Sequence, residues 1–472
     1  MSRLTHALSE PPTSRFVSAI YASLERTRQP AFFTATRTVS WMDWLAIVEG
    51  LIERFEPLRG ARTGILFRSS EISYALLLAL SLLDGDVFLI DQEMSGPEIE
   101  ELAAVNELDA MIDPCGEGEQ IELSDLTSGS RRSRSGRGEV TIFTSGSTGR
   151  PKAVRHDWSS LARPVRKRSS PIPQCWLLTY RPHLYGGLQV FLHCLVNQDP
   201  LAIPEPGMSV DALLDLMRRS EVRSVSATPS YWRRLITLGS PADLGSLQLH
   251  QITLGGEVAD QHLLSVLSRY YPGARLVHLY GTSEVGRCFT VTDGRAGFPA
   301  HFLDVPSNDG IALKLEDGEL HVRSANAMLG SSATAEADGG GTDWFATGDL
   351  VERVGDRCFF VGRRDDLINV GGNKVRPLRV EHVIQGIPGV RDVRVFARSS
   401  SLVGQMVACE YVAEPGFEPE AIKSAILQTC LERLEAHERP RFVQAVSTIG
   451  LSGADKKIRK LLPGTGPKEH PG

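Results

Sequence analysis

Residues 62–92 carry the pattern that most narrows the folds open to this chain. The apolar run "RTGILF" is followed by the longer apolar stretch "YALLLALSLL", a turn at Gly85 and a second apolar run, "DVFLID". This order indicates strand, helix and strand, the βαβ unit of parallel sheets. Residues 213–284 repeat the alternation, with short strands that end in Gly, Ser or Thr. The chain is therefore predicted to have an α/β fold.

The loops that follow three of the predicted strands form the candidate site. In open α/β sheets, ligands bind at the carboxyl ends of the strands. Polar loops that contain glycine follow Phe143, Leu254 and Leu279. We therefore expect these loops to meet at one shared site.

The loop after Phe143, "TSGSTGRPK", has the composition of a phosphate-binding loop. Its glycines let backbone N–H groups approach an anion, its hydroxyls add donors, and Lys152 adds a positive charge. In the nucleotide-binding P-loop a lysine follows the second glycine directly and Ser or Thr comes next. Here Arg150 and Pro151 intervene and Ala153 follows the lysine, which excludes that motif. The loop is predicted to bind a polyphosphate; the alternative is a surface turn rich in serine and glycine.

The composition excludes several classes of protein. The chain has 472 residues, of which 42% are hydrophobic and 23% charged, as in soluble globular proteins of two or three domains. A net charge of −6 argues against nucleic-acid binding, and the basic segment 127–138 is interpreted as a linker. The apolar stretches are too short for a bilayer and the polar start is not a signal peptide, so we expect a cytoplasmic protein without a membrane partner. Seven cysteines without a C-x-x-C pair indicate reduced thiols and no structural metal.

Changes of pattern divide the chain into domains. The stretch before residue 362 becomes β-rich, with a hairpin expected at Asp317–Gly318. The segments beyond it indicate a compact α+β unit that ends in a polar tail. We place an N-terminal domain at residues 1–362, a hinge at residues 363–366 and a C-terminal domain at residues 367–472.

Six motifs follow one another in an order that resembles the adenylate-forming superfamily. They are "TSGSTGRPK", "LGGE", "YGTSE", "DWFATGDL", "GRRDDLINVGGNKV" and "KKIRK". This superfamily includes acyl- and aryl-CoA synthetases, the adenylation domains of peptide synthetases, and luciferase. The resemblance spans residues 39–462. It implies a large N-terminal domain of stacked αβαβα sheets, a small β-barrel-like subdomain and a small, mobile α+β C-terminal domain.

The resemblance also implies roles for individual residues. The phosphates of ATP would be bound by Thr144, Ser145, Gly146, Ser147, Thr148, Gly149 and Lys152. Adenine and ribose would be bound by Gly255, Gly256, Glu257, Tyr280, Gly281, Thr282, Ser283, Asp349 and Arg363. Glu284 would hold Mg²⁺, which neutralises charge as pyrophosphate leaves. Lys457 would lie between the acid's carboxylate and the α-phosphate, where a cation offsets the repulsion of two anions.

Other residues would serve the acid, the acceptor and the domain movement. The acid pocket would be lined by His183, Tyr185 and Gly186. Asp365 would be the hinge, and Gly371 and Gly372 would leave room for a pantetheine arm. Lys456 stands where a glycine is usual, so Lys456 and Lys457 remain alternatives for the catalytic lysine.

The implied activity is a two-step ligation that uses ATP, Mg²⁺ and coenzyme A. A carboxylic acid and ATP give an acyl-adenylate and pyrophosphate, and a thiol then attacks the adenylate. Between the steps the C-terminal domain would rotate about Asp365 and withdraw Lys457. Coenzyme A is the preferred acceptor. The alternatives are transfer to a carrier protein and a non-catalytic nucleotide-binding module.

Overall fold

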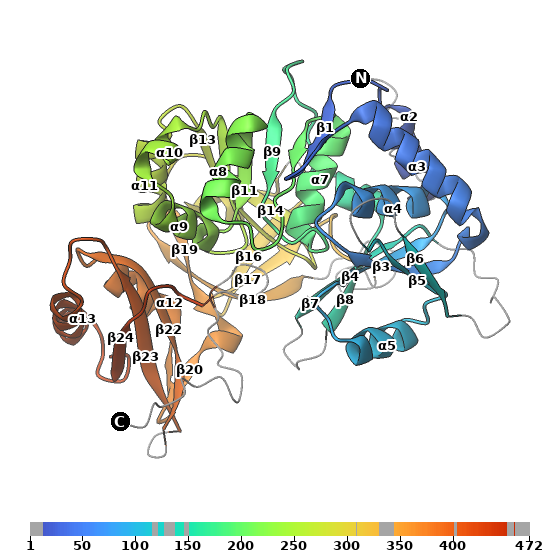
Figure 1. Cartoon of the computed structure of the whole chain (residues 1–472). Coiled ribbons are helices and arrows are strands. Elements are labelled where there is room, and N and C mark those ends of the chain that lie inside the picture. The colour runs from blue at the N-terminus through green and yellow to red at the C-terminus, as the bar shows by residue number, and fades with distance from the viewer. Residues whose placement is uncertain are drawn as a thin grey trace, which may run out of the picture.

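The computed structural model describes residues 13–115, 121–126, 137–145, 151–307, 309–329, 344–400, 404–450 and 457 (Figure 1). Two large sheets with their helices come first along the chain, followed by an antiparallel sheet and a C-terminal unit. Within these residues, no helix combines the length and the apolar character that crossing a membrane requires. Most of the basic segment 127–138 lies outside the described residues.

A six-stranded sheet contains the predicted βαβ unit. In it β3 (Arg62–Phe67) and β4 (Asp86–Asp91) pair in parallel, and α4 (Glu71–Leu82) connects them. Helix α4 is buried along almost its whole length, because it packs into one core shared by both large sheets. The other strands are β5 (Ala110–Asp113), β6 (Glu122–Asp125), β7 (Val140–Ser145) and β8 (Pro151–His156).

An eight-stranded sheet supplies two of the predicted site loops. Its order is β14-β13-β12-β11-β9-β10-β1-β2, and β11, β12 and β13 are parallel neighbours. The strands are β1 (Pro30–Phe33), β2 (Thr38–Ser40), β9 (Cys175–Leu178), β10 (Leu201–Ala202), β11 (Val222–Ala227), β12 (Gln251–Leu254), β13 (Arg275–Thr282) and β14 (Gly286–Val291). The loops after β12 and β13 therefore leave the same edge of the sheet, as predicted.

Side-chain caps set the start of the helices beside the site. Thr228 accepts a hydrogen bond from the N–H of Tyr231 at 3.0 Å and begins α9 (Pro229–Leu238). Asp260 accepts one from the N–H of Leu263 at 2.9 Å and begins α11 (Gln261–Tyr270). The other helices here are α2 (Thr13–Ala22), α3 (Trp41–Phe55), α5 (Gly96–Val105), α6 (Trp158–Ala162), α7 (Tyr185–Asn197), α8 (Val210–Arg219) and α10 (Pro241–Ser246), with the short helices η2 (Glu56–Leu58) and η3 (Ala300–Leu303).

A five-stranded antiparallel sheet stands where the barrel-like subdomain was expected. Its order is β15-β19-β18-β17-β16. The predicted hairpin is present: Asp317 and Gly318 have φ of 50° and 76°, the left-handed values that a two-residue turn needs. The strands are β15 (Phe298–Pro299), β16 (Ala312–Glu316), β17 (Glu319–Arg323), β18 (Phe345–Val354) and β19 (Arg357–Arg363).

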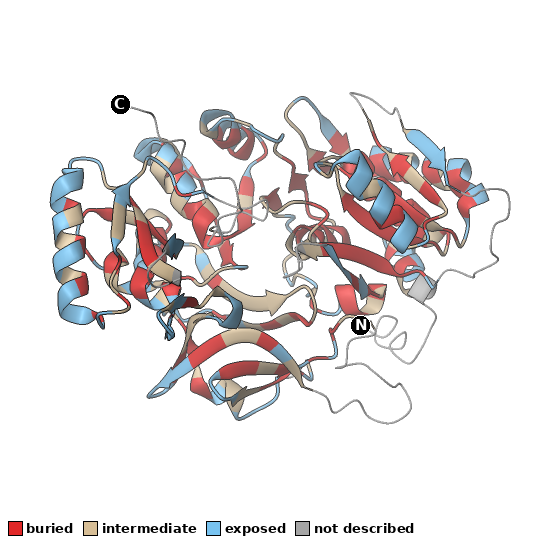
Figure 2. Ribbon diagram, turned by 90° about the horizontal axis from the view of Figure 1, so that it is seen from below, coloured by how far each residue is buried: buried red, intermediate tan, exposed pale blue. Residues whose placement is uncertain are grey.

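The C-terminal unit, residues 368–445, has a hydrophobic core of its own. Buried residues gather along its strands, whereas helix α13 presents an exposed outer face (Figure 2). Its elements are β20 (Ile368–Val370), β21 (Asn373–Val375), α12 (Pro377–Gln385), β22 (Val390–Ser400), β23 (Gly404–Ala413), α13 (Pro419–Arg433) and β24 (Phe442–Ala445). The predicted fold class, α/β with a smaller α+β part, is confirmed. The exact domain bounds stay a prediction.

Candidate active site

The β7–β8 hairpin brings the predicted phosphate lysine to the predicted metal ligand. Thr144 lies opposite Lys152 in the antiparallel pair. The Nζ atom of Lys152 is 3.7 Å from Oε1 of Glu284, which follows β13 in the other large sheet. The loops of the two sheets therefore meet, as the sequence predicted. Residues 146–150 lie outside the described residues, so the roles of Gly146, Ser147, Thr148 and Gly149 stay predictions.

The turn from β13 to β14 leaves no space for a side chain at Gly281. A Cβ atom there would lie 2.6 Å from the carbonyl oxygen of Gly286. The turn is held further by Thr282, whose Oγ1 accepts a hydrogen bond from the N–H of Val285 at 3.3 Å. The carbonyl oxygen of Glu284 accepts another from the N–H of Met328 at 2.6 Å. The backbone that carries the Glu284 carboxylate is thus held from both sides.

Asp349 joins Tyr280 and Arg363 in one polar cluster. The hydroxyl of Tyr280 donates to Oδ2 of Asp349 at 2.6 Å, and Nε of Arg363 lies 3.2 Å from Oδ1. Asp349 and Arg363 are directly opposite each other on β18 and β19, so the sheet register brings them together. Burial, and then the charge of Asp349, raise the pKa of Tyr280 well above its usual value. The phenol therefore stays protonated and available as a donor.

The ring of Tyr280 belongs to an aromatic group. It lies roughly parallel to the rings of Phe289 and Phe360, with centroids 5.3 and 4.8 Å away. This packing fixes the plane of Tyr280, the side chain predicted to stack on adenine. That stacking role stays a prediction.

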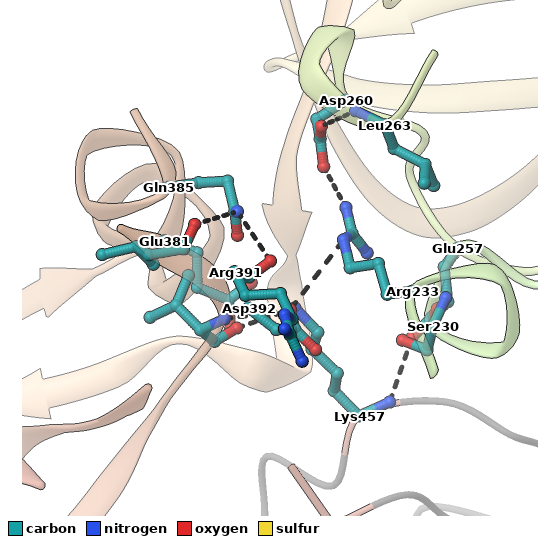
Figure 3. Close-up of polar contacts among 12 residues, drawn as sticks. Ser230, Arg233, Glu257, Asp260, Leu263, Glu381, Gln385, Arg391, Asp392 and Lys457 are labelled. Carbon is teal, nitrogen blue, oxygen red and sulfur yellow. Dashed lines mark hydrogen bonds and ion pairs between the residues drawn. The ribbon is translucent and has the colours of Figure 1, made fainter. Parts of the chain in front are cut away.

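The carboxylate of Glu257 has two backbone donors. Its Oε2 accepts a hydrogen bond from the N–H of Ser230 in the first turn of α9, at 2.9 Å. Its Oε1 accepts one from the N–H of Lys457 at 3.0 Å (Figure 3). A carboxylate at a helix N-terminus is favoured by the helix dipole. Glu257 thus connects the predicted nucleotide loop to the C-terminal end of the described chain.

The glycines beside Glu257 have separate structural reasons. Gly256 has a φ of +83°, which favours glycine. A Cβ atom at Gly255 would lie 3.1 Å from the side chain of Leu279 and 3.3 Å from the hydroxyl of Tyr180. The loop therefore packs tightly against β13.

The predicted acid pocket is built around the start of α7. His183 is buried, with Nε2 3.6 Å from Oδ2 of Asp91, and burial lowers its pKa to about 4. The imidazole is therefore neutral at pH 7. Tyr185 is the first residue of α7, and a Cβ atom on Gly186 would lie 3.1 to 3.3 Å from the ring of Tyr180.

Lys457 lies between the two parts of the chain, but its ammonium group faces the C-terminal unit. The Nζ atom donates to Oδ1 of Asp392 at 2.7 Å (Figure 3). It also donates to the carbonyl oxygen of Val393 at 2.7 Å. The side chain is 8% exposed. Lys456 lies outside the described residues, so the choice between the two lysines stays open.

The predicted hinge and acceptor residues lie just before and within the C-terminal unit. Asp365 is the middle residue of the short helix η4 (Arg364–Asp366) that follows β19. Gly371 and Gly372 form the turn between β20 and β21, with φ of 56° and 92°. The left-handed φ values of this turn favour glycine at both positions, which adds a structural reason to the predicted one. Their contact with a pantetheine arm stays a prediction.

Comparison with known proteins identifies the family. Residues 84–331 match the family model described as AMP-binding enzyme, which is more than half of the chain. The chain belongs to the AMP-binding enzyme family. Residues 379–456 match the model of the AMP-binding enzyme C-terminal domain.

Relatives of this AMP-binding enzyme include ligases with different acceptors in their names. The medium/long-chain fatty acid acyl-carrier-protein ligase FadD10 of Mycobacterium tuberculosis is 27% identical over 68% of this chain and 65% of its own length. The match thus spans less than two thirds of FadD10. The 2-succinylbenzoate CoA ligase of Listeria innocua is 24% identical over 88% of this chain and 95% of its own.

Solved structures share the fold of this AMP-binding enzyme. The anthranilate CoA ligase AuaEII in complex with anthranoyl-AMP has a TM-score of 0.73 at 17% identity, covering 93% of this chain and 95% of its own. MenE of E. coli with bound OSB-AMS has a TM-score of 0.71 at 18% identity, covering 93% and 94%.

Glu284 fits a magnesium ion that is held mainly by phosphates. Among the described residues, no group of three or more His, Cys, Asp and Glu side chains is arranged to hold a metal. Mg²⁺ is commonly bound by one or two carboxylates together with substrate phosphates. The side chain of Glu284 is 21% exposed and lies beside Lys152, so it would be the carboxylate of such a site.

Two residues of this site were missed in the sequence. His156 ends β8, and its Nε2 lies 2.8 Å from the carbonyl oxygen of Ser283, while burial lowers its pKa. Side chains alternate between the two faces of β8, so His156 lies on the same face as Lys152. This alternation could have predicted that His156 is near the site. Tyr180 lies between Gly186 and Gly255, and nothing in its local sequence indicated that position.

Proposed function

We propose that this AMP-binding enzyme is an acid–thiol ligase. It activates a carboxylic acid with ATP as an acyl-adenylate, releases pyrophosphate and transfers the acyl group to a thiol, preferably that of coenzyme A. The observation that carries the proposal is the convergence of five distant segments: Lys152 meets Glu284, Asp349 meets Tyr280, and the backbone N–H of Lys457 meets Glu257.

Each of these side chains has a role in adenylate formation. The carboxylate of Asp349 accepts hydrogen bonds from the ribose hydroxyls, and Arg363 donates to the ribose or a phosphate. Lys152 holds the outer phosphates, and Glu284 contributes the carboxylate for Mg²⁺. The metal neutralises charge that develops as pyrophosphate leaves. Lys457 reduces the repulsion between the acid's carboxylate and the α-phosphate.

The identity of the thiol acceptor and the class of the acid are two further parts of the proposal. Relatives named as CoA ligases and as acyl-carrier-protein ligases both occur, so transfer to a carrier protein is the second candidate. A non-catalytic nucleotide-binding module would have no need of Lys152, Glu284, Asp349 and Lys457 together. The aromatic residues Tyr180 and Tyr185 near α7 favour an aromatic or medium-length acyl group.

Pyrophosphate release over a panel of aromatic, short-chain and medium-chain acids tests the activity. We expect release that depends on one class of acid, followed by a thioester when coenzyme A is added. A thioester only with a phosphopantetheinylated carrier protein would assign the second acceptor. Absence of acid-dependent release across the whole panel would contradict the ligase and favour the binding module.

Replacement of Glu284 by Gln should make the reaction more dependent on magnesium. The change keeps the shape and removes the charge, so we expect the rate at low Mg²⁺ to fall about 10- to 100-fold and to recover partly as Mg²⁺ rises. Stability should change little, because the pair with the half-exposed Lys152 is worth about 0 to 1 kcal/mol.

The matched control is Glu316→Gln, which removes another lysine-paired carboxylate, 2.8 Å from Lys314 and away from the site. It should leave the magnesium titration unchanged. Unaltered kinetics of Glu284→Gln at low Mg²⁺ would show that Glu284 is not a metal ligand.

A further inference from the structure

We propose that Asp392 holds Lys457 in a resting position. When Lys457 moves to the substrates, Arg233 becomes the cation that neutralises the Asp392 carboxylate. The inference rests on the proposed function, in which Lys457 acts between a carboxylate and a phosphate. It adds two positioning residues from opposite sides of the interface between the C-terminal unit and the rest of the chain.

The ammonium group of Lys457 is already engaged without substrate. It donates to Oδ1 of Asp392 and to the carbonyl oxygen of Val393, both at 2.7 Å, and these two residues belong to β22. The side chains of Lys457 and Asp392 are 8% and 12% exposed, so water screens the pair weakly. The substrates must therefore compete with a buried carboxylate for this cation.

Arg233 lies on the other side of Asp392. It comes from α9, is 11% exposed, and its Nε is 3.9 Å from Oδ1 of Asp392 (Figure 3). Its guanidinium also pairs with Asp260, the residue that caps α11. Asp392 is thus placed between two cations that come from different parts of the chain. Leaving a buried carboxylate without a cation is strongly destabilising. Because Arg233 stays beside Asp392, Lys457 can leave without exposing the carboxylate to that cost.

The backbone of Lys457 is held separately from its side chain. Its N–H donates to Glu257 at 3.0 Å, on the nucleotide loop. The ammonium can therefore leave Asp392 by rotation of the side chain while the backbone stays at the nucleotide loop. A cavity of about 520 Å³ between the two parts of the chain is lined in part by His382 and by Asp260, the other partner of Arg233.

Chemical labelling of the folded protein tests the resting pair without turnover. Amines are acylated with a water-soluble reagent, and the modification of Lys457 is measured by peptide mass spectrometry against that of the half-exposed Lys152. We expect Asp392→Asn to raise labelling of Lys457 roughly tenfold, since one charge-assisted hydrogen bond is weakened. The matched control is Glu410→Gln, which removes a carboxylate paired with Arg394 on the same sheet and should change nothing.

Adenylation kinetics test the exchange of partners. Asp392→Asn should raise kcat/KM for adenylate formation several-fold, because Lys457 is released. Arg233→Gln should lower it several-fold, since Asp392 then depends on Lys457 alone, while Arg233→Lys should retain most of the activity. The double variant Arg233→Gln with Asp392→Asn should recover the loss. A merely structural pair would instead give additive losses.

The outcomes separate this inference from the proposed function. Unchanged labelling of Lys457 in Asp392→Asn, or a loss of adenylation like that of Lys457→Ala, would overturn the resting role of Asp392. If Arg233→Gln does not fold, Arg233→Lys and Asp392→Asn decide the question. Wild-type adenylation by Lys457→Ala would contradict the role proposed for Lys457, while the labelling result would still report on the ion pair. Absence of acid-dependent pyrophosphate release by the wild type is the separate result that would contradict the proposed function.

Discussion

Replacement of Lys457 by Ala is expected to slow acyl-adenylate formation by on the order of 10² to 10³, or roughly 3 to 4 kcal/mol, the loss typical of one preorganised electrostatic group. Two anions must approach each other for the carboxylate to attack the α-phosphate, and the lysine is the cation that offsets their repulsion. The measurement is acid-dependent exchange between pyrophosphate and ATP in a single half-reaction.

The controls for this variant use the second half-reaction and the neighbouring lysine. Transfer from supplied acyl-adenylate to coenzyme A should survive in Lys457→Ala. Lys456→Ala should leave adenylation near wild type; if it alone abolishes the step, the catalytic lysine is Lys456. The reciprocal variant is Gly371→Asn, which the φ of 56° at this turn tolerates and which should spare adenylation while slowing transfer. Loss of both steps in both variants would contradict the rotation of the C-terminal domain.

Replacement of Asp349 by Ala is expected to raise the KM for ATP by on the order of 10², with a smaller fall in kcat. A hydrogen bond to a charged group contributes about 1.5 to 3 kcal/mol, and this carboxylate would accept two from the ribose. The measurement is the ATP dependence of pyrophosphate release at saturating acid.

Tyr280→Phe separates nucleotide binding from local packing. It removes the hydroxyl that donates to Asp349 at 2.6 Å but keeps the carboxylate and the aromatic ring. We expect a much smaller rise in KM than for Asp349→Ala. Equal effects of the two variants would show that Asp349 acts by holding Tyr280 and not by binding the ribose.

Local patterns in the sequence determined the class of fold. The βαβ unit from β3 to β4 followed from the alternation of apolar runs, because a short strand and a buried helix differ in length and in their flanking turns. The turn at Asp317–Gly318 followed equally from its two residues, whose left-handed φ values few other pairs adopt. The order of the motifs then indicated the family, which the match over residues 84–331 establishes.

The partners of the site residues were decided only by tertiary structure. Lys457 and Glu257 are 200 positions apart, and Lys457 and Asp392 are 65 apart, so no local pattern pairs them. Asp392 lies in a strand without any motif, and its importance arises because β22 faces α9 across the interface. The sequence by itself determined the fold class and the family, and it predicts which residues carry the chemistry. Only the packing of the C-terminal unit against the nucleotide loop decided which charged groups those residues contact. The energy of a buried ion pair depends on the distance between its charges and on their desolvation, and a short stretch of sequence specifies neither.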